Sequence, residues 1–244
     1  FDMLAQQRLD YLTMTTERAA EIDAAEARLK ELRDAFARRV FDSSRSEYTR
    51  RWILDTVSSS PELVKWLYRL FDRKFNPARK THPSAAKLER EIAEFKRQAA
   101  IAFVDNRTGY DIFSFMTRII THVQKTNFYK VQKRSHALRL DASLLDPLVF
   151  HGPLYGIFFV LGFYATATHM RAEDVARGGI RLIRVTPGNY DDELDRMPLL
   201  NYALGPVAQR LKHKDIAESG AKGVVVPHQE FAREGLRAVL DFSE

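Results

Sequence analysis

The chain has 244 residues, of which 45% are hydrophobic, and this is enough for a hydrophobic core in one large or two small domains. The absence of cysteine excludes disulfide scaffolds, thiolate zinc sites and cysteine nucleophiles, and it fits a reducing compartment. The net charge of +6 is spread along the sequence without a basic stripe interleaved with aromatic residues, which argues against nucleic-acid binding as the main function.

The first part of the sequence is helical in its pattern. Residues 1–42 place apolar side chains at helical spacings among alanine, glutamate and arginine, which are good helix formers. This pattern predicts a helical hairpin or a short coiled coil, with a partner-binding helix as the alternative. Further helices are predicted over residues 46–56 and from Ser60-Pro61, where serine suits the cap position and proline the first turn.

Two longer helices follow in the same region. Ser84 is placed to cap a helix that reaches about Val104, with apolar residues at helical spacing. After a turn at residues 105–109, an amphipathic helix is predicted over residues 110–124. The sequence therefore predicts an all-helical region over residues 1–124.

The pattern changes to mixed helix and strand after Lys125. Residues 136–140 alternate between polar and apolar and predict a strand. Residues 152–168 carry no charge, and their length is at the lower limit for a membrane-spanning helix. Their glycines and their many aromatic and β-branched residues favour two adjacent buried strands that meet near Leu161-Gly162. Residues 179–185 alternate again and predict a further strand.

The end of the sequence predicts two helices around a short strand. A long helix is expected over residues 191–211, with acidic residues in its first turn, where they suit the helix dipole. A buried strand at residues 223–227 and a final amphipathic helix over residues 230–242 follow. The predicted fold class is α/β (α+β), in which the N-terminal helical region precedes a mixed sheet flanked by helices over residues 125–244.

Basic residues gather in three clusters of this second region. In the first and third clusters the cation stands beside glycine, which lets the backbone approach a ligand closely. Cations in such places predict a pocket for a small anionic substrate. The clusters are residues 176–181 (Ala-Arg-Gly-Gly-Ile-Arg), 209–215 (Gln-Arg-Leu-Lys-His-Lys-Asp) and 219–224 (Ser-Gly-Ala-Lys-Gly-Val).

These clusters also carry a family resemblance. Arg-Gly-Gly-Ile-Arg, then Gln-Arg-Leu-Lys, then Lys-Asp-Ile-x-x-x-Gly-Ala-Lys-Gly before an apolar run resemble the substrate domain of glutamate dehydrogenases, above all the large-subunit NAD-specific kind. The flanking residues 125–130 (Lys-Thr-Asn-Phe-Tyr-Lys) and 174–179 agree. The resemblance covers about the second half of the chain and implies a partial substrate domain over residues 125–244.

The resemblance implies a role for each matching residue. Lys222 falls on the family's catalytic lysine, which polarises the substrate carbonyl. Arg177 replaces a lysine that contacts the side-chain carboxylate, and its planar guanidinium suits that group. Lys212 falls on a lysine that contacts the α-carboxylate, and Gln209 on a substrate-facing glutamine. The substrate-binding residues implied are thus Arg177, Gly178, Gly179, Gln209 and Lys212.

Each of these residues also has a purely structural interpretation. Arg177 suits a surface position after a tight turn, and Gly178-Gly179 suits a bulge. Lys212 suits the C-terminus of a helix. The sequence departs from the family pattern at Ser219, where glycine is usual. The histidines lack partners at metal-ligand spacing, and no metal is predicted.

The implied reaction is the reversible oxidative deamination of L-glutamate to 2-oxoglutarate and ammonia with NAD. The resemblance implies a homo-oligomer in the cytoplasm or the mitochondrial matrix, with neither nucleic acid nor membrane as a partner. No Gly-x-Gly-x-x-Gly fingerprint follows a strand, so NAD is expected to bind a Rossmann domain absent from this chain. We therefore expect a fragment or a truncated relative that is inactive alone. The alternative is an inactive partner-binding or assembly module derived from that enzyme.

Overall fold

The computed structural model describes residues 50–146, 150, 154–173, 176–208 and 219–243. These residues fall within one compact unit, residues 48–244. The helices predicted over residues 1–42 lie outside the described residues. The boundary expected between residues 124 and 125 stays a prediction.

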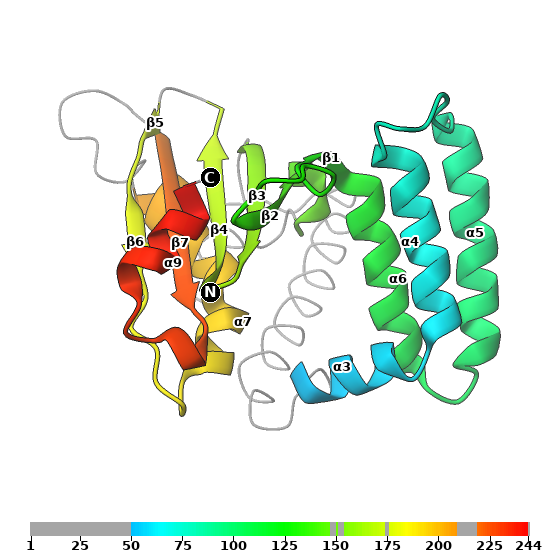
Figure 1. The fold of residues 1–244 in the computed structure, drawn as a ribbon, viewed down its shortest axis with the longest axis horizontal. Helices are drawn as coiled ribbons and strands as arrows, with labels where there is room; N and C mark the ends of the chain where they lie inside the picture. The colour runs from blue at the N-terminus through cyan, green and yellow to red at the C-terminus, as the bar shows by residue number, and fades with distance from the viewer. Residues whose placement is uncertain (1–49, 147–149, 151–153, 174–175, 209–218, 244) are drawn as a thin grey trace, which may run out of the picture. The chain divides into compact units, whose positions relative to one another are not determined.

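Four helices form the first part of this unit (Figure 1). Leu70, Phe95 and Phe113 are wholly buried between them. The ring of Trp66 meets Phe95 edge-on, with 5.6 Å between ring centroids. The helices are α3 (Arg50–Ser58), α4 (Pro61–Phe75), α5 (Ala85–Ala102) and α6 (Arg107–His122).

The starts of these helices follow the capping signals of the sequence. Pro61 opens α4, and the hydroxyl of Ser84 accepts a hydrogen bond from the backbone N–H of Lys87 at 3.3 Å, as predicted for α5. Helix α6 begins earlier than predicted. The side chain of Asn106 accepts a hydrogen bond from the N–H of Gly109 at 3.0 Å, so residues 107–109 of the predicted turn form the first turn of the helix, while Asp105 does lie in a turn.

Lys74 ties α4 to the end of α6. Its ammonium donates hydrogen bonds to the carbonyls of Ile120, Thr121 and Val123 at 2.7, 2.8 and 2.8 Å. A cation at a helix C-terminus is favourable, and these carbonyls have no partner within the helix. Burial lowers the pKa of Lys74 from its ordinary value.

We expect Lys74→Met to destabilise this junction. The variant keeps most of the side-chain volume but leaves three carbonyls without their charged donor, at a cost of about 2 kcal/mol. For a unit of this size the midpoint of thermal unfolding should fall by roughly 4–8 °C. Differential scanning fluorimetry measures the shift. The exposed Lys87 on α5 provides the control, because Lys87→Met should leave the midpoint unchanged.

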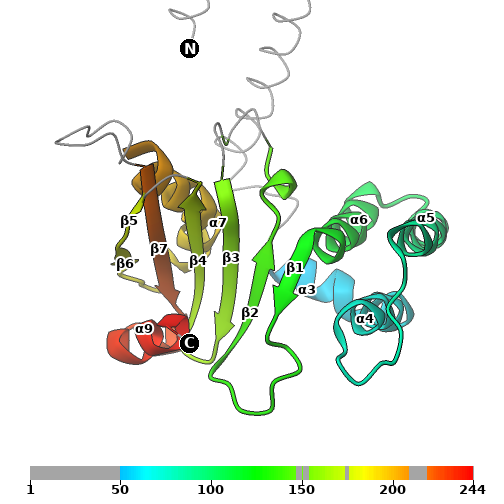
Figure 2. The same ribbon diagram turned by 90° about the horizontal axis from the view of Figure 1, so that it is seen from above.

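A seven-stranded sheet forms the second part of the unit, in the order β1-β2-β3-β4-β7-β5, with β6 also paired to β7 (Figure 2). Strands β1 to β4 and β7 pair antiparallel, whereas β5 and β6 run parallel to β7. The predicted mixed sheet flanked by helices is therefore confirmed. The strands are β1 (Val123–Thr126), β2 (Ser135–Leu140), β3 (Leu154–Gly162), β4 (Ala165–Ala172), β5 (Ala176–Arg177), β6 (Ile180–Leu182) and β7 (Ser219–Pro227).

From Leu154 onward, the uncharged segment is a β-hairpin. Strands β3 and β4 meet where the sequence predicted, just after Leu161-Gly162, and Val160 pairs with Ala167. Among the described residues, no helix has the length and hydropathy needed to cross a membrane.

The Lys-Thr-Asn-Phe-Tyr-Lys segment joins the helices to the sheet. The side-chain amide of Asn127 donates to the carbonyl of Ser135 at 2.9 Å and accepts from the N–H of Ala137 at 2.7 Å. The hydroxyl of Tyr129 donates to the carboxylate of Asp72 on α4 at 2.9 Å. Burial and this carboxylate raise the pKa of Tyr129. In the described structure these side chains therefore fix the junction.

Helices cover both faces of the sheet. On one face, α7 (Tyr190–Tyr202) packs over the buried Val224 and Val226 and continues into a π-helical turn, η2 (Ala203–Val207). On the other face, α9 (Gly235–Ser243) packs Ala238 against Val225. The final helix was predicted from residue 230, which is wrong. Residues 229–231 form the short 3-10 turn η3 (Gln229–Phe231), and α9 begins only at Gly235. A 3-10 turn, η1 (Ala142–Leu144), precedes β3.

Candidate active site

Lys222 lies in β7, next to the junction of antiparallel and parallel pairing. On one side it pairs with Met170 of β4, which is wholly buried, and on the other side the next residue, Gly223, pairs with Ile180 of β6. Because side chains alternate along a strand, Lys222 shares a face with Val224 and therefore lies on the face that α7 covers. The side chain of Lys222 is half-buried.

The glycine pair of the first cationic cluster lies against this lysine. A Cβ atom added to Gly179 would stand 2.8 Å from the Lys222 ammonium nitrogen, and the next nearest atoms also belong to the Lys222 side chain. The carbonyl of Gly179 accepts a hydrogen bond from the N–H of Gly223 at 2.8 Å. A side chain at position 179 would therefore make the Lys222 ammonium move from this position, which costs little because the ammonium ends a flexible side chain.

The backbone of Arg177 is placed close by. Arg177 in β5 pairs parallel with Gly220 of β7, two residues before Lys222, and Gly178 approaches the carbonyl of Ala221. The structure thus brings the first and third cationic clusters together, as the prediction of a shared pocket requires. The side chain of Arg177 and the predicted substrate-binding residues Gln209 and Lys212 lie outside the described residues.

The opposite face of β7 is filled by α9. A Cβ atom at Gly223 would lie 2.5 Å from the ring of Phe242. The ring of His169 on β4 lies near Phe242, with 6.0 Å between ring centroids, and burial lowers the pKa of His169, with a further contribution from Arg171. His169 pairs with Gly223, so it belongs to this opposite face and not to the lysine's surroundings.

Two residues on the segment that covers the sheet escaped the sequence analysis. Gly205 in η2 lies against the base of the Lys222 side chain, and Asn201 on α7 is wholly buried and donates to Thr168 of β4. The Gly205-Pro206 dipeptide is a helix-breaking signal inside the helix that was predicted to be continuous over residues 191–211. The sequence holds no signal for the partner of Asn201, because that contact joins distant segments.

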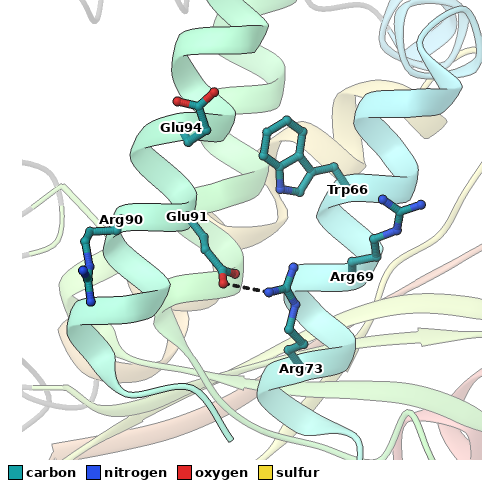
Figure 3. Close-up of a pocket in the computed structure, with 6 residues that line it drawn as sticks. All are labelled: Trp66, Arg69, Arg73, Arg90, Glu91 and Glu94. Atoms are coloured by element: carbon teal, nitrogen blue, oxygen red, sulfur yellow. Dashed lines mark hydrogen bonds and ion pairs between the residues drawn. The ribbon is translucent and has the colours of Figure 1, made fainter.

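A groove of about 450 Å³ lies elsewhere, between α4 and α5 (Figure 3). Its two carboxylates are paired with arginines: Glu91 pairs with Arg73 at 2.7 Å, and Glu94 accepts from Arg97 at 2.6 and 2.9 Å. Its lining residues all belong to α4 and α5, and none belongs to the sheet that carries Lys222. We therefore do not assign this groove to the site around Lys222. Its lining residues are Trp66, Arg69, Arg73, Arg90, Glu91 and Glu94.

Metal ligation finds no support in the part of the chain that is described. Among those residues, no three histidine or acidic side chains gather closely enough to hold a metal ion. Lys222 contributes an amine group beside the backbone of Gly179.

Residues 96–242 match the family described as the catalytic domain of bacterial NAD-glutamate dehydrogenase. The chain belongs to this family. The match includes β7, which carries Lys222, and the neighbouring elements β5 and η2.

The chain is similar to several glutamate dehydrogenases. It is 33% identical to glutamate dehydrogenase 2 of Dictyostelium discoideum over 81% of the chain and 19% of that protein. It is 30% identical to the NAD-specific glutamate dehydrogenase of Neurospora crassa over 80% of the chain and 19% of that protein. The Saccharomyces cerevisiae NAD-specific enzyme is 40% identical over 43% of the chain and 10% of the enzyme. In the first two alignments, the chain thus spans 19% of the relative's length.

Proposed function

We propose that the enzyme to which this chain belongs oxidises L-glutamate to 2-oxoglutarate and ammonia with NAD. The observation that carries the proposal is the placement of Lys222 against Gly179, two residues that the chain folding brings together from separate motifs. An amine in that position reaches a substrate that enters over the glycine pair. Family membership and the names of the relatives support the same reaction.

In the proposed mechanism, Lys222 acts at the α-carbon of the substrate. Water adds to the intermediate imine and loses a proton to give a carbinolamine, whose hydroxyl then loses a proton as ammonia leaves and the carbonyl forms. The Lys222 ammonium stabilises the negative charge that develops on this oxygen, and a preorganised cation of this kind acts strongly in a partly dehydrated site. Arg177, with its planar fork, is assigned to the side-chain carboxylate. Gln209 and Lys212 are assigned to the substrate, with Lys212 at the α-carboxylate. Gly178 and Gly179 keep the backbone open for it.

When bound, NAD accepts the hydride from the α-carbon. No residue of the described part is assigned to hold it. Dinucleotide sites need a strand, a glycine-rich turn and a helix N-terminus. Strand β6 leads to α7 through Thr186-Pro187-Gly188-Asn189, which offers a single glycine. We propose that a separate Rossmann domain of the enzyme binds NAD, and that residues 125–244 contribute the substrate side.

We further propose a homo-oligomeric enzyme of the cytoplasm or the mitochondrial matrix. Membership of the family supports the assembly. Sedimentation velocity of the full-length enzyme tests the oligomer.

The reaction is tested with the full-length enzyme and isotopically labelled glutamate. We expect NADH, 2-oxoglutarate and ammonium in equal amounts, and no reaction with aspartate at the same concentration. Formation of NADH from leucine or valine in preference to glutamate would reject the proposed substrate. Failure of the pure full-length enzyme to oxidise any amino acid would favour the inactive assembly module.

A further inference from the structure

The helix that covers Lys222 changes its hydrogen bonding where it meets the lysine. Helix α7 ends at Tyr202 and continues as the π-helical turn η2. In this turn the N–H of Ala208 donates to the carbonyls of Ala203 and Gly205. Pro206 within the turn has no N–H to donate to the residue one α-turn earlier, which accounts for the break in the α-helical pattern. Such π turns occur often at functional sites.

Gly205 in this turn contacts Lys222 closely. A Cβ atom added to Gly205 would stand 3.0 Å from the Cβ, 3.3 Å from the backbone nitrogen and 3.7 Å from the Cα of Lys222. All three nearest atoms thus belong to the lysine. The backbone of Gly205 is not in the left-handed region, so its conformation does not demand glycine. The need for glycine arises from the closeness of Lys222.

Strand β7 has little freedom to move away from an added methyl group. Lys222 pairs with the buried Met170, and the next residue, Gly223, donates to Gly179 and faces the Phe242 ring on the opposite side. Strand β7 is therefore held by the pairing on its two sides and by the Phe242 ring on the face opposite η2. A methyl group at Gly205 has to displace either the π turn or the Lys222 side chain.

Two glycines from separate elements thus frame the lysine. Gly205 lies against the base of its side chain, and Gly179 lies against the ammonium at its tip. We infer that Gly205, held by the π turn at Pro206, is a positioning residue that sets the direction of the Lys222 side chain toward the substrate. This inference rests on the proposed catalytic role of Lys222.

The test uses Gly205→Ala in the full-length enzyme, with steady-state oxidation of glutamate as the readout. A displacement of the ammonium by a fraction of an ångström to about 1 Å should lower kcat by about 10- to 100-fold. The KM for NAD should stay within about twofold, because no residue of the described part is assigned to hold NAD, whereas a displaced ammonium weakens stabilisation of the transition state. The pH dependence of kcat should also shift, which a purely structural defect does not cause.

Two control variants separate positioning from loss of folding. Gly188→Ala introduces a methyl group with nothing within 4 Å and should behave as the wild type. Gly109→Ala places a Cβ 2.5 Å from the Phe103 ring in the helical region, so it should lower thermal stability and leave kcat of the folded enzyme unchanged. If Gly205→Ala behaves like either control, the inference is wrong.

Pro206→Ala serves if Gly205→Ala does not fold. It adds no bulk near Lys222 but restores the missing N–H, so the α-helical pattern is expected to extend and move Gly205. We expect Pro206→Ala to lower kcat as Gly205→Ala does. An unchanged kcat and an unchanged pH profile would overturn the inference. A wild-type rate for Lys222→Ala would reject the proposed function itself. A loss in Lys222→Ala without a loss in either η2 variant would reject only the positioning role.

Discussion

Lys222→Met in the full-length enzyme should lower kcat for glutamate oxidation by about 10³-fold. This corresponds to about 4 kcal/mol of lost transition-state stabilisation. Methionine is one atom shorter than lysine but keeps most of the side-chain volume, so the contact at Gly205 is retained and only the approach of the ammonium to Gly179 is lost. What is lost is the charged donor at the position where substrate oxygen becomes negative.

The kinetic pattern identifies the role of the lysine. If Lys222 acts mainly in the transition state, kcat and kcat/KM should fall together and the KM for glutamate should change little. A raised KM with an unchanged kcat would instead make Lys222 a substrate-binding residue. A wild-type kcat would contradict any catalytic role.

Lys87→Met is the matched control for the loss of one positive charge. Lys87 is exposed on α5, and the same exchange there should leave kcat and KM unchanged. Lys222→Met should shift the unfolding midpoint by no more than about 2–3 °C, because the Lys222 side chain is only half-buried and such positions contribute little to stability. A rate loss that followed a large loss of stability would not support the catalytic role.

Local signals predicted much of the fold. Ser84 and Pro61 mark the starts of their helices, and the uncharged segment forms the hairpin of β3 and β4. These features depend on neighbouring residues, which is why spacing and capping suffice. The start of α9 was missed because Phe231 continues the apolar pattern into a 3-10 turn, a distinction that depends on backbone hydrogen bonds.

The candidate site was only partly predictable. The motifs placed Lys222 and Gly179 in one site, and the parallel pairing of β5 and β6 with β7 is what brings them together. That pairing joins distant segments, so no local pattern shows it. The contact of Gly205 with Lys222 is of the same kind, since it depends on how η2 packs over β7.

Asn201 illustrates a buried polar group whose role only packing reveals. Its side chain is fully buried, with an exposed fraction of 0%. Its amide nitrogen donates to the carbonyl and the hydroxyl of Thr168 on β4 at 2.6 and 2.9 Å. Its amide oxygen is buried without a partner among the described residues. The donor bonds hold α7 over the sheet, and α7 leads directly into the π turn over Lys222.

Asn201→Asp should therefore destabilise the packing of α7 by about 3 kcal/mol near pH 8. The exchange replaces the donating nitrogen with an oxygen that faces the Thr168 carbonyl, and it buries a carboxyl group. Amide hydrogen exchange of peptides from α7 and β4 in the full-length enzyme measures this loss, as an increase of about 100-fold in exchange rate. Rates are divided by the intrinsic exchange rate at each pH.

The pH dependence of that loss distinguishes burial of charge from simple loss of a hydrogen bond. Burial raises the pKa of the introduced carboxyl above its ordinary value of about 4, so the folded state holds the proton more tightly than the unfolded state. The stability of the variant relative to the wild type then decreases as pH rises from the pKa of the carboxyl in the unfolded state to its higher pKa in the folded state. The loss of stability relative to the wild type should therefore be much smaller near pH 5 than near pH 8. Asn189→Asp at the start of α7 is the control, since Asn189 accepts from the N–H and hydroxyl of Thr186 through the oxygen that aspartate retains and loses only a long, exposed bond of 3.3 Å to the Arg184 carbonyl. A pH-independent loss in Asn201→Asp, or an equal loss in Asn189→Asp, would contradict the assignment of Asn201 as the buried donor that holds α7 in place.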